Sequence, residues 1–261
     1  YDKIEFVNEV SGRDPRLAQT IRTTKGLNFS NCITGYQPHK YIVEANLGSS
    51  AASYNDLPLF RMAEVYLNYA EAKAELGEIT QGDLDISVNK IRARAKMPNL
   101  NLKVANDSPD PYLSSAETGY TNVTGANKGV ILEIRRERNI ELVLESQNRW
   151  WDLMRWKEGA CIGQKMEGLY IPADKIGKAY DVNGDGNADI CVYSGTQPSV
   201  KENVTWFNLD TDYKLSEKGS GKIVFFSDIV RKWNEERDYF YPIPKEDIIL
   251  TGGKIEQNKG W

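Results

Sequence analysis

Residues 57–76 show the hydrophobic and polar pattern of a helix that lies mostly inside the protein. Polar side chains recur at spacings of three and four residues from Arg61 to Glu75, so they share one stripe of the helix surface. Apolar and small side chains cover the remaining surface, which predicts packing between other helices. Asp56 provides a cap, Pro58 suits the first turn and Gly77 ends the helix.

Three further helices are predicted, at 83–96 with Asp83 as its cap, at 127–146 and at 148–158. The short linkage across 77–82 makes the first two helices an antiparallel hairpin. Residues 1–55 carry turn signals and a short strand around 40–43, and residues 98–126 form a long polar loop. The stretch 160–225 is irregular with short strands, notably at 223–226, and prolines make 238–244 extended.

Composition and charge exclude several classes of function. The chain has 33 Lys and Arg against 37 Asp and Glu, a net charge of −4, which gives no basic surface for nucleic acid. No run of about 20 apolar residues could span a bilayer. His39 is the single histidine, so zinc sites with two histidines are excluded, and we interpret it as an exposed loop residue. The three cysteines leave a Cys161–Cys191 bridge and buried free thiols both open.

One segment has the spacing of a calcium-binding loop. Oxygen-bearing side chains occur at positions 1, 3, 5 and 9 of the segment that begins at Asp181, and a glycine at position 6 permits the sharp turn. Val192 replaces the bidentate Glu of an EF-hand at position 12, so the loop departs from that motif. We predict a structural calcium ion held by Asp181, Asn183, Asp185 and Asp189, with the carbonyl of Asn187.

Charged and aromatic residues around 133–156 suggest two further sites, and both have structural explanations. Glu141 and Glu145 are four residues apart, as a pair of glycosidase carboxylates could be, but nearby arginines would keep both ionised. We therefore expect Glu64, Glu71, Glu137 and Glu141 to be buried or paired with arginines. Trp150, Trp151 and Trp156 could form a sugar platform, but core packing is expected for at least two of them.

Several motifs, in order, resemble the SusD/RagB family. Asp14-Pro-Arg-Leu17 is similar to that family's D-P-R-L element, and residues 59–77 to its R-x-A-E-x-Y-L-x-x-A-E-A helix. Residues 89–95 resemble N-x-I-R-x-R-A, and residues 134–156 resemble I-x-x-E-R-x-x-E-L-x-x-E followed by R-x-x-D-L-x-R-W. Residues 241–246 and 257–261 resemble the Y-P-I-P-x-x-E and Q-N-P-G-W ending, with Lys259 in place of Pro.

This resemblance implies a mainly α fold, in which tetratricopeptide-like helix pairs support a loop-rich region with short strands. It implies one C-terminal domain over 1–261 with an insertion at about 160–225, and an N-terminal half that lies outside this sequence. It also implies a lipid-anchored protein on the outer face of a Bacteroidetes outer membrane. Such a protein captures glycans, without catalysis, for a SusC-like TonB-dependent transporter.

The helices have a packing explanation, so we expect ligand contacts from the loop region 26–54 and its flank. Its aromatic rings could stack on sugars and its polar groups could bind hydroxyls. The candidate ligand-binding residues are Arg22, Asn28, Phe29, Tyr36, Tyr41 and Tyr54, with packing as the alternative for the tyrosines. Capture of peptides and glycoside hydrolysis remain the alternative functions.

Overall fold

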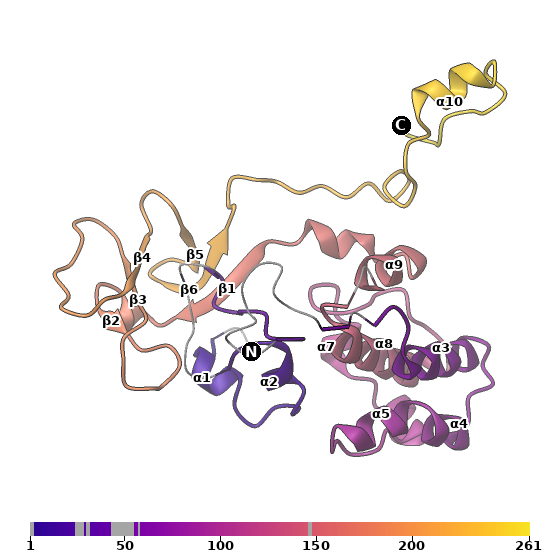
Figure 1. Ribbon diagram of the computed structural model, residues 1–261, viewed down its shortest axis with the longest axis horizontal. Coiled ribbons are helices and arrows are strands. Elements are labelled where there is room, and N and C mark those ends of the chain that lie inside the picture. Colours follow the sequence, from indigo (N-terminus) through magenta and orange to yellow (C-terminus); the bar gives the residue numbers. More distant parts are fainter. Residues whose placement is uncertain (1–2, 24–28, 30–31, 43–54, 57, 146–147) are drawn as a thin grey trace.

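The computed structural model describes residues 3–23, 29, 32–42, 55–56, 58–145 and 148–261. The helices α3–α9 gather at one end of the molecule, and small β-sheets with α1 form the other end (Figure 1). A C-terminal tail leaves the last strand and ends in α10, away from both (Figure 1). The fold is mainly α with short strands, as the sequence predicts.

The helices of the described residues are short except for α3 and α8, which pack against each other. They are α1 (Phe6–Glu9), α2 (Leu17–Thr20), α3 (Met62–Glu75), α4 (Gln81–Ile86), α5 (Val88–Arg94), α6 (Leu102–Asp107), α7 (Pro111–Ser114), α8 (Lys128–Leu142), α9 (Asn148–Arg155) and α10 (Lys245–Leu250). None of these helices is both long and apolar enough to cross a membrane.

The first long helix begins later than predicted. Arg61, not Asp56, stands at its N-cap, with extended backbone at φ −144° and ψ 153°. The side chain of Arg61 bonds to Glu141 and Glu145, so a tertiary contact accompanies this extended residue. Gly77 ends the helix at φ +76°, as predicted.

The predicted helix 83–96 is two helices, α4 and α5, which meet at Ser87. Thr80 and Asp83 form a capping box, in which each side chain accepts a bond from the other residue's backbone N–H. Asp83 is therefore the third residue of α4 and not its cap. The Ser87 hydroxyl donates to the carbonyl of Asp83, a local bond that competes with helix continuation.

The prediction of one long loop over 98–126 is wrong, because α6 and α7 lie within it. Asn101 caps α6 by accepting a bond from the N–H of Val104. Asp110 caps α7, and Pro111 occupies its first position. Asn-rich and Pro-rich composition here marks helix caps as well as turns.

The region 160–225 forms two three-stranded sheets. The first has the antiparallel order β1-β6-β5, with β1 (Met166–Ile171), β5 (Lys214–Glu217) and β6 (Ser220–Phe225). The second has the order β2-β3-β4, with β2 (Ala179–Tyr180), β3 (Ile190–Tyr193) and β4 (Thr205–Asn208). The predicted strand 223–226 is the end of β6, whereas Lys40 and Tyr41 lie in a turn and not in a strand.

The two ends of the molecule have separate hydrophobic cores. The helical core includes Leu67, Leu132 and Trp156. The core of the sheets draws Phe6 and Phe29 from the N-terminal region to side chains such as Ile171, Ile190 and Ile223. The chain therefore leaves the sheet end after its first 40 residues, builds the helical end and returns.

Candidate functional site

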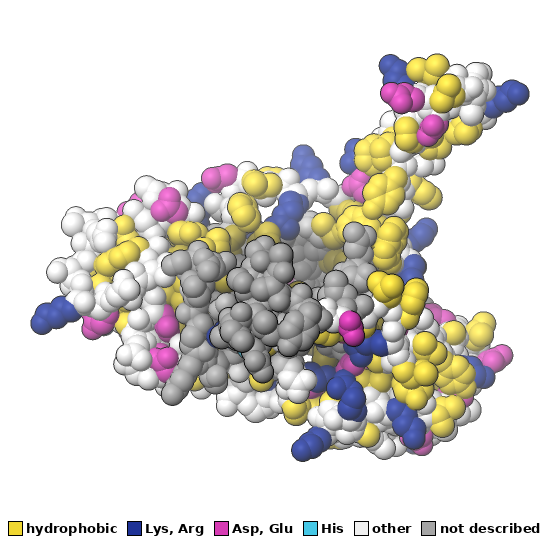
Figure 2. All heavy atoms as spheres, in the orientation of Figure 1, with side chains coloured by type: hydrophobic (Ala, Val, Ile, Leu, Met, Phe, Trp, Pro, Cys, Tyr) yellow, Lys and Arg dark blue, Asp and Glu magenta, His cyan; other side chains and the backbone are white. Residues whose placement is uncertain are grey.

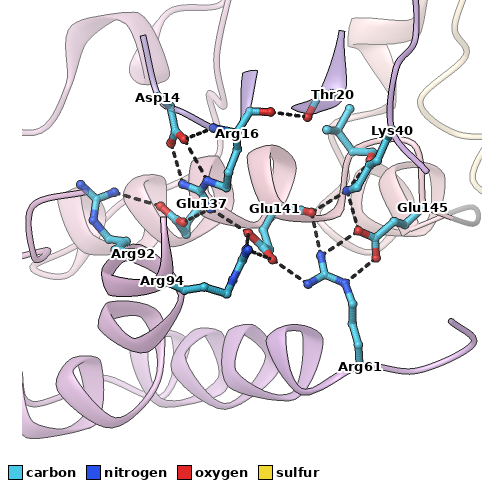
Figure 3. Close-up of polar contacts among 11 residues, drawn as sticks. Asp14, Arg16, Thr20, Lys40, Arg61, Arg92, Arg94, Glu137, Glu141 and Glu145 are labelled. Carbon is cyan, nitrogen blue, oxygen red and sulfur yellow. Dashed lines mark hydrogen bonds and ion pairs between the residues drawn. The ribbon is translucent and has the colours of Figure 1, made fainter. Parts of the chain in front are cut away.

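A cluster of charged side chains joins the N-terminal segment to α8 (Figure 3). We call it the arginine–glutamate cluster, and it consists of Asp14, Arg16, Lys40, Arg61, Arg92, Arg94, Glu137, Glu141 and Glu145. The three glutamates follow one another at spacings of four residues, so they share one face of α8 and the turn after it. The cations come from four separate segments, which meet only in the folded chain (Figure 3).

Arg16 lies at the centre of this cluster, with its side chain only 6% exposed. Its Nη1 donates to Glu137 Oε1 at 2.6 Å and to Glu141 Oε2 at 2.8 Å, and its Nη2 donates to Asp14 Oδ2 at 2.6 Å. Arg61 forms bonds of 2.6 Å to Glu141 and to Glu145. The buried charges are therefore paired and hydrogen-bonded, as a water-poor site requires.

These contacts keep the carboxylates ionised. Burial alone would raise the pKa of Glu141, but hydrogen bonds from Arg61 and Arg16 hold it below its ordinary value. The pKa of Glu145 is lowered in the same way by Arg61 and Lys40, against the effect of burial. A glycosidase general acid needs a raised pKa, so neither carboxyl is suited to that task.

The other predicted arginine–glutamate pairs are also present. Glu71 is buried and accepts bonds from Arg155 Nη2 at 2.7 Å and from Trp156 Nε1 at 2.6 Å. Glu64 is half-buried and lies 3.7 Å from Arg138. The expectation that these motif glutamates are buried or paired is therefore confirmed.

A cavity of about 290 Å³ opens beside the cluster. Its walls include Arg16, Arg61 and Glu141, and Lys40, Tyr41 and Arg94 lie around it. The side chain of Arg94 is 58% exposed, and Tyr41 is 44% exposed with a backbone φ of +60°. A tyrosine in this left-handed conformation is uncommon, and strained residues gather at functional sites. The cavity therefore combines an accessible ring with fixed hydrogen-bond donors.

Five of the six predicted ligand-binding residues fall into three groups. Tyr41 borders the cavity, whereas Asn28 and Tyr54 lie outside the described residues. Phe29 is 3% exposed in the core of the sheets, so its ring offers no open face. Tyr36 packs edge-on against Phe6 and donates to Glu9 Oε2 at 2.6 Å. Both rings thus pack, but against the sheet end and not against α3.

Arg22 takes part in the bridge between the N-terminal segment and residues near Pro38. Its backbone N–H donates to the carbonyl of Gln37 at 2.9 Å, next to the Ile21–Pro38 pairing. His39, which follows, is half-buried with its Nδ1 enclosed, and not the exposed residue that we expected. Sequence reasoning missed Lys40 and Arg94 as cavity residues, because Glu141 and Glu145 lie far from them along the chain.

The predicted calcium loop connects β2 to β3. Gly184 and Gly186 adopt φ of +74° and +91°, which permits the tight turn. Asp181 accepts backbone bonds from both glycines, at 2.7 and 2.8 Å, and Asp185 Oδ1 accepts one from Asn187 at 3.0 Å. The described residues contain no group of three or more His, Cys, Asp or Glu side chains arranged to hold a metal ion.

The charges of this loop nevertheless suit a cation. Burial raises the pKa of Asp189, and the negative charges of Asp181 and Asp185 raise it further. Asn183 is buried and donates to Asp189 Oδ1 at 3.3 Å. A hard cation would relieve this repulsion, and these oxygens are the ligands that calcium prefers.

The cysteines and tryptophans are also placed by the structure. All three cysteines are free, so the Cys161–Cys191 bridge is absent and the alternative of free thiols holds. Trp156 is buried in the helical core, and Trp150 packs edge-on against Trp233. Trp151 is 53% exposed. Core packing is therefore confirmed for Trp156, whereas Trp150 is half-buried and lies outside both hydrophobic cores.

Comparison with known proteins finds similar solved structures and a matching family model. A SusD-like protein from Bacteroides fragilis is 23% identical over 88% of this chain and 31% of its own, with a TM-score of 0.49. A SusD-like carbohydrate binding protein from the same species is 26% identical over 69% of this chain and 37% of its own, with a TM-score of 0.48. This chain thus spans about a third of the length of either protein.

A comparison with curated proteins finds no match. The model of the SusD family, however, matches residues 22–261. That span holds the α3 and α8 motifs whose glutamates form the ion pairs described above, as well as the C-terminal motifs. The chain therefore belongs to the SusD family.

Proposed function

We propose that this chain is part of a cell-surface protein that binds glycans and delivers them to a TonB-dependent outer-membrane transporter. The observation that carries the binding proposal is the cavity at the arginine–glutamate cluster, where Tyr41 is exposed beside Lys40 and Arg94. A sugar ring can stack its C–H face on Tyr41 while its hydroxyls bind the exposed guanidinium of Arg94. Family membership supports the same class of ligand.

Binding without catalysis fits the ionised state of the cluster. Its carboxylates are held by arginines on both sides, so they can accept hydrogen bonds from hydroxyls but have no proton to donate. The absence of a product when oligosaccharides are incubated with the protein and chromatographed would support this part of the proposal. Release of shorter sugars would contradict it.

The binding experiment is isothermal titration of the chain with oligosaccharide and peptide mixtures. Tyr41→Ala should weaken binding of the glycan about fivefold or more, because stacking on one ring contributes roughly 1 kcal/mol or more. Trp151→Ala tests the competing exposed ring on α9. Tyr112→Ala on α7, where the tyrosine is 51% exposed, is the control for the loss of a surface ring.

Three results distinguish the alternatives. Binding of peptides and not of glycans would favour the alternative ligand for this architecture. Equal affinity of the Tyr41→Ala variant and the parent chain for the glycan would show that the glycan does not bind at this cavity. Loss of binding in the Trp151→Ala variant would move the site to α9.

The cell-surface and transporter parts need a test in a native host. Surface exposure through a lipid anchor predicts that protease added to intact cells removes the protein. Association with a SusC-like transporter predicts that the two proteins copurify from detergent-solubilised outer membranes. A protein that protease reaches only after cell lysis would contradict this placement.

A further inference from the structure

A second cavity lies at one end of the β1-β6-β5 sheet, far along the chain from the arginine–glutamate cluster. The strand register brings this end together, since Met166 of β1 pairs with Phe225 of β6, and Lys214 of β5 pairs with Val224. The segment that follows β6 closes the cavity as far as Arg231. Its volume of about 370 Å³ falls within the ~300–1,000 Å³ range of ligand pockets.

The charged side chains that are described in the lining of this cavity are all positive. Its lining includes Lys165, Lys214 and Arg231, and no acidic residue is among the lining residues that the structure describes. Asp228, beside it, is 3.2 Å from Lys214, in an exposed pair that solvent screens. In the described part of the chain, Lys165 and Arg231 form no ion pair. A chain with a net charge of −4 thus concentrates unneutralised cations at this point.

An exposed ring borders the same cavity. Phe226 is 60% exposed although it is a large apolar side chain, and its backbone φ is +52°. An aromatic residue in the left-handed region is an outlier, and such strain marks places where the surrounding structure fixes one conformation. Figure 2 shows basic side chains beside hydrophobic ones where the chain leaves β6 for the C-terminal tail. The cavity thus offers a stacking face next to anion-binding groups.

We propose that this cavity binds an anionic sugar residue, with Phe226 against the ring and Lys165 and Arg231 on a carboxylate or sulfate. The carbohydrate part of this inference rests on the proposed function, and the acidic group rests on the charge of the cavity. A neutral sugar would leave the two cations without partners. A small inorganic anion would not use the exposed ring.

Calorimetric titration at low ionic strength tests the proposal. The probes are an oligogalacturonate, the neutral galacto-oligosaccharide of the same length, and a sulfated galacto-oligosaccharide. We expect an acidic probe to bind at least tenfold more tightly than the neutral one, and salt to weaken its binding, because charge-assisted bonds provide the difference. Tighter binding of either acidic probe than of the neutral one supports the inference, and the ratio of the two acidic affinities tells carboxylate from sulfate.

Variants locate the binding. The double variant Lys165→Gln with Arg231→Gln should lose about tenfold or more in affinity for the acidic probe. Phe226→Asn should lose severalfold, because Asn tolerates the left-handed backbone while the ring is removed. Lys218→Gln, in the exposed turn between β5 and β6, removes one charge from the same sheet and should change little.

The inference would be overturned by equal affinity for acidic and neutral probes, by no binding of either acidic probe, or by an unchanged affinity in the double variant. Failure here is separable from failure of the proposed function. A chain that binds neutral glycan through Tyr41, and shows no preference for acid, keeps the proposed function and loses this inference alone.

Discussion

At the scale of single residues, buried charges hold the helical end together. Arg138 on α8 has a side chain that is 6% exposed, and it donates to Asp152 at 2.6 Å and to Asn68 at 2.7 Å. Asp152 also accepts bonds from Arg155 at 2.8 and 3.0 Å, so removal of Arg138 leaves this buried carboxylate with one of its two arginines. Loss of a buried partner is far more costly than loss of an exposed pair. The charged residues of these motifs are therefore buried, and they stabilise the fold as core residues do.

Arg138→Ala should lower the free energy of unfolding by ~3–5 kcal/mol, as measured by urea denaturation. Arg136→Ala is the matched control on the same helix, since Arg136 is 38% exposed and pairs with Asp110 at 2.7 Å. That variant should lose about 0–1 kcal/mol. Equal losses in the two variants would contradict the role given to burial.

The stability of this end should also depend on pH. The pKa of Glu71 is below its ordinary value, because bonds from Arg155 and Trp156 outweigh the effect of burial. A group whose pKa is lowered in the folded state stabilises the protein above its unfolded pKa, and this stabilisation disappears as pH falls through the folded value.

Glu71→Gln should therefore be clearly less stable than the parent chain at neutral pH, and the difference should narrow as pH falls below about 4.5. Urea denaturation of both proteins across the acid range measures this difference. A constant difference from neutral to acid pH would show that the charge of Glu71 is not what stabilises the fold.

At the scale of elements, the β2–β3 connection tests the calcium prediction. The loop is closed by its own hydrogen bonds, so it can form without a metal, and a bound ion would add stability by neutralising Asp181, Asp185 and Asp189. We expect calcium to raise the melting temperature of the parent chain and to have little effect on the Asp181→Asn with Asp185→Asn variant.

Metal analysis of protein dialysed against calcium provides the direct measurement. One equivalent of bound calcium in the parent chain and none in the double variant is the expected result. Magnesium serves as the control, because its small octahedral site suits this flexible set of oxygens poorly. A parent chain without bound ion would end the calcium hypothesis.

At the scale of the whole molecule, a small contact fastens the C-terminal tail to the helical end. Trp233 lies against Gly159, and the hydroxyl of Tyr239 accepts a bond from the N–H of Gly159 at 3.1 Å. Beyond this point the tail folds on itself, as Trp261 donates to the carbonyl of Phe240 at 3.0 Å. The two C-terminal motifs thus pair with each other.

Gly159→Ala should release the tail, because a Cβ atom there would lie 2.0 Å from a ring carbon of Trp233. The expected result is faster proteolysis after residue 226, with a loss of about 1–3 kcal/mol for the steric conflict. Gly163→Ala in the same 3₁₀ segment (Gly159–Gly163) is the control, since its nearest contact is an ordinary 3.4 Å. Unchanged proteolysis in Gly159→Ala would show that other contacts hold the tail.

Three features follow from the amino-acid sequence alone: the family, the helices around α3 and α8, and the expectation that their glutamates are buried or paired with arginines. The helices follow from local periodicity, which the chain expresses without reference to distant segments. The glutamates have the spacing that puts them on one helix face, but the arginines that pair with them come from distant segments of the chain. The calcium-like loop is a local pattern too, and its glycine turn is present at Gly186. The ends of the helices are predicted less well. At the start of α3, Arg61 bonds to Glu145, which lies outside that helix. At the junction of α4 and α5, the Ser87 side chain bonds to the carbonyl of Asp83.

Which residues are accessible to a ligand depends on the folded structure and does not follow from the sequence. Phe29 and Tyr36 have polar neighbours in the sequence, yet the ring of Phe29 is buried in the core of the sheets. The hydroxyl of Tyr36 donates a hydrogen bond to Glu9. Tyr41 remains at the cavity because a turn places it beside Glu145, more than 100 residues further along the chain. The cationic cavity at Phe226 arises from strand register, which joins Lys165, Lys214 and Arg231. Exposure is a property of distant contacts, and no local pattern of residues encodes it.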